Sequence, residues 1–183
     1  MIAEFSLKTK PQNKKAHYIF IAFLVGAVAA GILYIYFMKI EKYHGLVGLL
    51  TMMLVIAAIF MYTRYIAAQY YYDVTLPGDT PLFVVRHKIG KRETVMCRIE
   101  LASIVSVEKQ TRAERKGHKT PADLAVYNYS PSVDPEITYL ITARSRYEKA
   151  EITVEANDEF AATLLRYAEI ARAEYGAAFD DEE

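Results

Sequence analysis

The chain has little of the chemistry on which most catalytic or metal-binding proteins depend. It contains no tryptophan, one cysteine and four histidines in 183 residues. A lone Cys97 cannot form an internal disulfide, and scattered histidines do not supply the ligands of a zinc site. The motifs of serine hydrolases, phosphate-binding loops, dinucleotide-binding turns and zinc proteases are also missing. We therefore expect neither an enzyme nor a protein with a metal or other cofactor.

The chain also lacks net charge, but its 22 basic and 22 acidic residues are unevenly distributed. Residues 64–120 hold 11 basic and 6 acidic residues, whereas residues 121–183 hold 5 basic and 14 acidic ones. The acidic second half would repel phosphate, and no clear set of stacking aromatic rings accompanies the basic segment. Nucleic-acid binding is therefore not expected.

Two long segments contain no charged residue. They run from Tyr18 to Met38 and from Gly45 to Thr63, and at 1.5 Å per residue each is about as long as a bilayer hydrocarbon core is thick. We predict transmembrane helices over 18–38 and 45–66. A cleaved signal peptide is the alternative for the first segment, which is longer than a signal-peptide core and is followed closely by the second.

The short link between the predicted spans makes them antiparallel neighbours, so both ends of the hairpin lie on one side of the membrane. Four lysines precede the first span and two lie in the link, and the positive-inside rule therefore predicts that both termini are cytoplasmic. Neither uncharged segment, 18–38 or 45–63, contains an Asp, Glu, Lys, Arg or His, which argues against an ion or proton pathway.

Small residues in the first span favour close helix packing. Gly26 with Ala30 and Ala27 with Gly31 form two overlapping pairs, at the spacing that lets helix backbones approach each other. The packing partner is either the second span or a second copy of the chain, so a homo-oligomer is possible.

After the spans, short alternating apolar segments and turn signals predict seven β-strands. They cover residues 71–76, 82–87, 93–99, 104–107, 124–129, 137–143 and 148–154. The polar segment from Thr111 to Pro121 is predicted to be a loop. A C-terminal helix follows with Asn157 as its cap, and its buried face is predicted to consist of Phe160, Leu164, Ala168, Ala171 and Tyr175.

This order of elements predicts a membrane-anchored α+β fold: a two-helix hairpin, then a PH-like barrel or sandwich of seven antiparallel strands closed by a C-terminal helix. The segment YYYDVTLPGDTPLFVVRHKIGKRETVMCRIELASIVSV, with apolar Ile99, Leu101, Ile104 and Val107, resembles the bacterial PH-like (bPH) membrane proteins. The resemblance covers about residues 46–175. It implies a PH-like fold and a place in the bacterial inner membrane rather than a defined activity. A cystatin-like curved sheet with one helix is the alternative fold.

These observations divide the chain into four predicted parts. They are a cytoplasmic N-terminal arm (1–17), a transmembrane hairpin (18–70), a cytoplasmic PH-like domain (71–176) and an acidic tail (177–183).

Basic residues gather in two regions, 86–98 and 109–119. The candidate lipid-facing or partner-facing residues are Arg86, Lys88, Lys91, Arg92, Arg112, Arg115, Lys116 and Lys119. Near an anionic leaflet each basic residue contributes about 1 kcal/mol. Phosphoinositide-binding PH domains usually carry basic residues in the first hairpin loop, whereas the loop LPGDT of this chain has none and contains Asp79. Specific binding of an inositide headgroup is therefore not expected.

The sequence favours a scaffold or accessory subunit that binds another protein. An acidic surface would serve as its docking site, formed by Glu148, Glu151, Glu155, Asp158, Glu159 and Glu169. The alternative is a sensor of anionic lipid in the bilayer, acting through the basic regions. A third hypothesis, an enzyme at the membrane, requires a deep cleft with convergent polar side chains.

Overall fold

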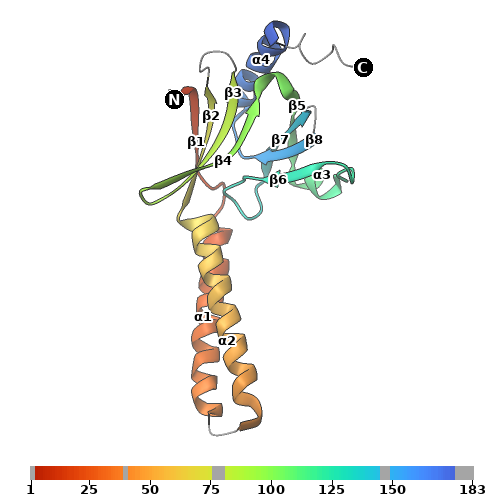
Figure 1. The fold of residues 1–183 in the computed structure, drawn as a ribbon. Helices are drawn as coiled ribbons and strands as arrows, with labels where there is room; N and C mark the ends of the chain where they lie inside the picture. Colours follow the sequence, from red (N-terminus) through yellow and green to blue (C-terminus); the bar gives the residue numbers. More distant parts are fainter. Residues whose placement is uncertain (1–2, 39–40, 76–80, 145–148, 176–183) are drawn as a thin grey trace. The chain divides into compact units, whose positions relative to one another are not determined.

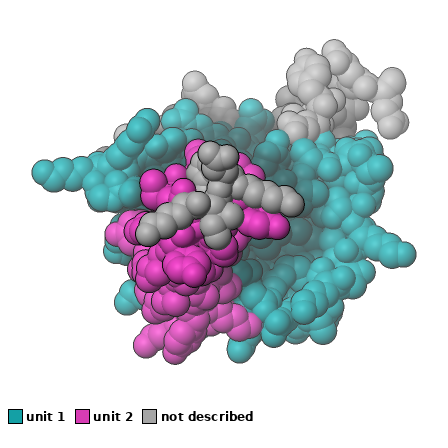
Figure 2. Space-filling view, turned by 90° about the horizontal axis from the view of Figure 1, so that it is seen from below, with its two compact units in different colours: residues 1–12, 69–183 teal, residues 13–68 magenta. Residues whose placement is uncertain are grey.

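A helical hairpin interrupts a β-sheet in this computed structural model (Figure 1). The structure describes residues 3–38, 41–75, 81–144 and 149–175. Strand β1 (Ala3–Thr9) precedes the hairpin and β2 (Ala68–Thr75) follows it, yet the two strands pair antiparallel with Thr9 opposite Tyr70. The chain accordingly falls into two compact units, residues 1–12 with 69–183 (unit 1) and residues 13–68 (unit 2), which are coloured separately in Figure 2.

Unit 2 consists of α1 (Lys15–Phe37) and α2 (Glu41–Met61), with α2 continued by one turn of π-helix, η1 (Tyr62–Ile66). The helical segments 15–37 and 45–66 are each long and apolar enough to cross a membrane, and only 11% of either apolar window is buried. An α-helix satisfies its own backbone hydrogen bonds, so it can present apolar side chains outward to lipid. The two helices predicted from the sequence are therefore present, with slightly different ends.

The four small residues predicted to pack on α1 are not all closely packed. Ala27 and Ala30 are buried, and a Cβ placed on Gly26 would lie 3.7 Å from the side chain of Leu54 on α2. A Cβ on Gly31 would meet nothing within 4 Å. Three of the four predicted packing residues thus lie in close-packed positions, and Gly31 does not.

Unit 1 contains two four-stranded sheets. The first has the order β1-β2-β3-β4, with β3 at Leu82–Ile89 and β4 at Arg92–Glu100. A short 3₁₀ turn, η2 (Leu101–Ser103), leads to the second sheet. Its order is β5-β7-β8-β6, with strands β5 (Ile104–Thr111), β6 (Ala125–Asn128), β7 (Ile137–Arg144) and β8 (Lys149–Val154).

Helix α4 (Asp158–Tyr175) ends the described chain and contributes to the core of unit 1. The backbone N–H of Phe160 donates a 2.8 Å hydrogen bond to the side chain of Asn157, which confirms the predicted cap. The ring of Phe160 lies among those of Phe5, Tyr72 and Phe83, with centroids 5.6 to 6.3 Å away. The predicted buried face is confirmed at Phe160, Leu164, Ala168 and Ala171, each at most 1% exposed. The side chain of Tyr175 lies outside the described residues.

Three sequence predictions need correction. The N-terminal segment contains β1, so the β region has eight described strands rather than seven, and they form two sheets rather than a closed barrel. Strand β6 pairs parallel with β8 and so is not part of a simple meander. The predicted loop after Thr111 begins with α3 (Arg112–Gly117). Thr111 and Glu114 form a reciprocal capping box there, the S/T-x-x-E pattern that favours a helix start.

Candidate functional site

Both connections to unit 2 leave the same end of the first sheet. Thr9 and Tyr70 are opposite each other, and beyond them the chain reaches unit 2 after Gln12 and before Gln69. We call this end of unit 1, marked by Gln12 and Gln69, the link end. The rings of Tyr70 and His87 are 5.0 Å apart, and three residues of strand span about 10 Å. The β3–β4 turn at Gly90 therefore also lies at the link end.

The second sheet reaches the same end through Gln12. Its backbone N–H donates to Ser132 Oγ at 2.8 Å, its side-chain amide donates to the carbonyl of Ile137 at 2.7 Å, and its Oε1 accepts from the N–H of Glu136 at 2.9 Å. Ile137 pairs with Thr111, the last residue of β5. Helix α3, which begins at the next residue, is thereby also placed at the link end.

The β3–β4 turn carries three of the predicted basic residues. Ile89 pairs with Arg92 and leaves Gly90 and Lys91 as a two-residue turn, in which Gly90 has φ of +59°. A positive φ at the first turn residue suits glycine and matches the twist of a hairpin. Lys91 and Arg92 are exposed and Lys88 is half-buried. None of the three forms an ion pair with another described residue.

Arg86, on the same hairpin, has a different role. It forms ion pairs with Asp73 and, at 2.6 Å, with Glu93, and it lies over the ring of Tyr71. Asp73 is only 1% exposed and also accepts a hydrogen bond from Ser6. The hydrogen bond to Asp73 is the main reason that the pKa of Arg86 is raised above its usual value. Arg86 therefore neutralises a buried carboxylate and is not available to a ligand.

The basic residues around α3 separate in the same way. Arg112 and Arg115 both pair with Asp134, and Arg115 also donates to the carbonyl of Pro135 at 3.0 Å. Lys116 and Lys119 are exposed and form no ion pair with a described residue.

Three of the eight predicted residues thus hold carboxylates of the chain itself, and the other five form no ion pair with a described residue. Lys119 lies between His118 and Thr120, which both contact Glu151 near the end of the second sheet opposite Ile137. We call the remaining four the basic surface: Lys88, Lys91, Arg92 and Lys116. Within unit 1 the β3–β4 turn extends to one side and α3 to the other (Figure 1).

The predicted acidic docking surface is wrong at two of its members. Glu151 is 5% exposed and lies 3.0 Å from the ring of His118, and Glu155 is 2% exposed. Glu155 accepts hydrogen bonds from Ser130 and from the N–H and hydroxyl of Ser132. Both glutamates hold loops against β8 and its C-terminal end, and neither can meet a partner. Glu148 lies outside the described residues.

Asp158 is exposed, but it too has internal partners. It accepts hydrogen bonds from the Lys109 ammonium group at 2.8 Å and from the hydroxyl of Tyr139. These contacts, the one to Lys109 first, lower the pKa of Asp158. Burial, with the hydrogen bond to Asp158, raises the pKa of Tyr139 to about 12. The cluster ties the start of α4 to β5 and β7.

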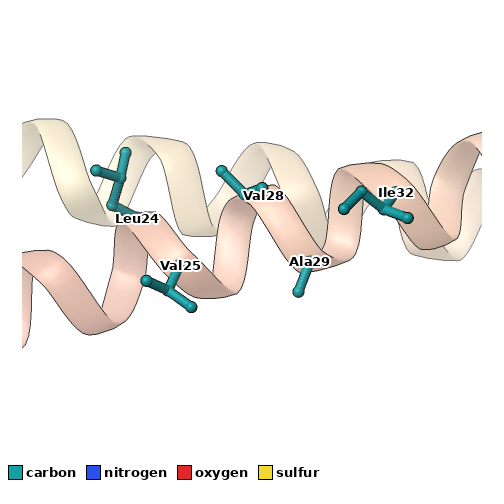
Figure 3. Close-up of a pocket in the computed structure, with 5 residues that line it drawn as sticks. All are labelled: Leu24, Val25, Val28, Ala29 and Ile32. Carbon is teal, nitrogen blue, oxygen red and sulfur yellow. The ribbon is translucent and has the colours of Figure 1, made fainter.

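An apolar hollow of about 300 Å³ lies along α1 (Figure 3). Its lining consists of Leu24, Val25, Val28, Ala29 and Ile32, and none of these side chains has a polar atom. The hollow offers no acid, base or nucleophile, and its chemistry suits an acyl chain. Among the described residues, no three His, Cys, Asp or Glu side chains come together as metal ligands.

Comparison of the chain with protein-family models and with curated proteins gives no match. The geometry of the link end is therefore the basis on which a function can be inferred.

The sequence did not reveal which carboxylates form ion pairs with Arg86, Arg112 and Arg115. Asp73 lies 13 residues from Arg86, and Asp134 lies 19 residues from Arg115. Only the fold brings them together. One signal was present: Asp73 is a lone charge in an apolar strand, and a buried carboxylate needs a partner.

Proposed function

We propose that the protein is an integral membrane protein whose β unit binds anionic phospholipid through the basic surface. One observation carries this proposal: four basic side chains that form no ion pair with a described residue, Lys88, Lys91, Arg92 and Lys116, belong to the β3–β4 turn and to α3, both placed at the end of unit 1 from which the two covalent links to the apolar helices leave. Anionic headgroups are the class of ligand that such a surface fits.

Several features support a membrane anchor with both links on one side. The two apolar helices expose most of their side chains. Strands β1 and β2 pair with each other although one precedes and the other follows the hairpin, which supports a hairpin that enters and leaves the membrane on the same side. Cleavage of the first helix as a signal peptide would remove β1 from the sheet, so this pairing disfavours that alternative. The excess of lysine before the first span favours the cytoplasmic side.

Anchoring also makes weak contacts sufficient. A basic residue near an anionic surface gains about 1 kcal/mol, which is too little for a free protein to bind tightly through a few side chains. A unit anchored in the same bilayer stays close to the headgroups, so their effective concentration is high. We therefore expect binding that responds to the fraction of anionic lipid and to salt.

Lysine reactivity in the intact protein tests the proposal without any substitution. The full chain is reconstituted in vesicles of phosphatidylcholine, with or without phosphatidylglycerol, and treated with an amine-acetylating reagent before mass spectrometry. We expect Lys88, Lys91 and Lys116 to be protected only with phosphatidylglycerol. Protection is expected to disappear near 1 M salt, where the screening length is about 3 Å.

Lys149 is the internal control. It begins β8 at the hairpin with Arg144, the opposite end of the second sheet from Ile137, and it is 48% exposed. Its reactivity should not change with lipid composition. Equal labelling of Lys88, Lys91 and Lys116 in both kinds of vesicle would overturn the proposal.

A protein-binding scaffold remains a second candidate, because one observation favours it. Strand β6 is an edge of the second sheet, and its Val126 and Tyr127 are 57% and 39% exposed. An exposed apolar edge strand can pair with a strand of another chain. A photo-crosslinking residue in place of Val126 should then capture one defined partner in native membranes, a different protein or a second copy. The same crosslinker in place of exposed Val105 on β5 should not capture it.

A further inference from the structure

The end of the β3–β4 hairpin exposes apolar side chains as well as charged ones. All residues from Ile89 to Met96 are exposed, on both faces of the hairpin. In contrast, β2 in the same sheet is mostly buried. The exposed fractions are 36% for Ile89, 39% for Val95 and 46% for Met96. The hairpin therefore extends beyond the packed part of unit 1.

Ile89 is the apolar residue nearest the tip. It lies directly before Gly90 and pairs with Arg92, and its two other cationic neighbours along the chain are Lys88 and Lys91. A Cβ added at Gly90 would meet no atom within 4 Å, so nothing in the described chain covers the turn. An apolar side chain surrounded by lysine and arginine stems suits the bilayer interface, where aliphatic stems lie in the apolar layer and charged heads remain among the headgroups.

We infer that the β3–β4 tip inserts Ile89 below the headgroups of an anionic bilayer, and that Lys88, Lys91 and Arg92 hold it there. This inference rests on the proposed function and deepens it from surface contact to insertion. Charge complementarity and the position of the turn at the link end select lipid over a protein partner as the occupant. Val95, opposite Arg86, adds exposed apolar area on the other face of the hairpin, farther from the turn.

The absence of tryptophan from the chain makes the test direct. In the full-length Ile89→Trp variant the introduced residue is the sole indole fluorophore. We expect its emission to shift to the blue in vesicles that contain phosphatidylglycerol, and brominated acyl chains to quench most of it. In phosphatidylcholine alone, both effects should be absent.

Two further variants serve as controls. Val105→Trp places the indole at an exposed site at the start of β5, the end opposite Thr111, and its emission should not respond to brominated lipid. Because tryptophan itself favours the interface, Ile89→Ser provides a test without an added aromatic ring. It should make the protection of Lys88 and Lys91 disappear at a lower salt concentration than in the unaltered chain.

Insertion and surface binding fail in different ways. If Lys88 and Lys91 are protected but the tryptophan introduced at position 89 is not quenched, insertion is wrong and the proposed function stands. If neither protection nor quenching appears, both insertion and the proposed function are wrong.

Quenching of equal strength in phosphatidylcholine alone would show that the basic residues do not hold the tip in the bilayer, and it would overturn their part in the inference. A shift to the blue without quenching by brominated lipid would show that a protein surface covers the turn, and it would overturn insertion.

Discussion

At the scale of single residues, the local carboxylates decide what a basic side chain can do. Arg86 and Lys88 lie on the same face of β3, two residues apart. Arg86 reaches the buried Asp73, whereas Lys88 has no ion-pair partner among the described residues. Two neighbouring cations of similar sequence context therefore have opposite roles, one in stability and one in the proposed lipid contact.

This difference predicts opposite effects of two matched substitutions. Arg86→Gln leaves Asp73 buried without its cation, and the free energy of unfolding should fall by about 3 kcal/mol, as in other broken buried pairs. Lys88→Gln, like most surface substitutions, should change it by less than about 0.5 kcal/mol. Urea unfolding in detergent micelles, followed by tyrosine fluorescence, measures both. Equal stability of the two variants would contradict the structural role of Arg86.

The cluster around Asp158 predicts how stability depends on pH. The pKa of Asp158 is lowered in the fold, so its contribution is present above the usual pKa of about 3.8 and is lost as the pH falls through the lower folded value. The pKa of Tyr139 is raised from 10.0 to about 12, so its contribution is complete below pH 10 and is lost as the pH rises toward 12.

Unfolding of the Asp158→Asn variant at a series of pH values tests the acid limb. The variant should be less stable than the unaltered chain near neutral pH, and the difference should close at acid pH, where Asp158 is protonated in both folded and unfolded chains. Tyr139→Phe should remove the alkaline loss assigned to the hydroxyl group and should weaken the acid limb without abolishing it, because Lys109 still binds Asp158. A difference between Asp158→Asn and the unaltered chain that stays constant down to acid pH would contradict the assignment.

At the scale of elements, α4 supplies one buried stripe to the core of unit 1. Phe160, 1% exposed and surrounded by three aromatic rings, should cost about 4 kcal/mol of unfolding free energy when replaced by alanine, because a cavity remains. Ile170 on the same helix is 45% exposed, and Ile170→Ala should cost less than about 0.5 kcal/mol. The same urea titration checks both variants, and a small effect at Phe160 would show that α4 is not part of the cooperative core.

The elements that the sequence predicted best are those with strong local patterns. Uncharged runs predicted α1 and α2, alternating apolar segments at 82–87 and 93–99 predicted the strands of the β3–β4 hairpin, and apolar spacing predicted the buried face of α4. Strand β1 was missed because its partner β2 lies more than 60 residues away across the hairpin. The parallel pairing of β6 with β8 is equally non-local. No local periodicity reports such pairings, and the same limit hid the partners of the arginines at the candidate site.

At the scale of the whole molecule, the fold ties the β unit to the helices by two neighbouring strands of one sheet. A domain on a single linker can turn any surface toward the membrane. A unit that must keep β1 and β2 paired has both links fixed at the same end, and hydrogen bonds of Gln12 with Ser132, Glu136 and Ile137 bring the second sheet to that end. The position of the basic surface at the link end therefore follows from strand pairing and does not depend on linker flexibility.

This double link predicts a specific membrane topology. In a Cys97→Ala background, exposed Lys10 and Gln69 are replaced by cysteine one at a time, and exposed Tyr43, before the second apolar segment, is replaced as the opposite-side control. A membrane-impermeant maleimide should label Lys10→Cys and Gln69→Cys only in inverted vesicles, and Tyr43→Cys only in intact cells. Labelling of Lys10→Cys and Gln69→Cys from opposite sides would be incompatible with the β1–β2 pairing. Labelling of both only from outside the cell would leave the pairing intact but would reverse the proposed orientation, and would place the basic surface away from the cytoplasmic leaflet.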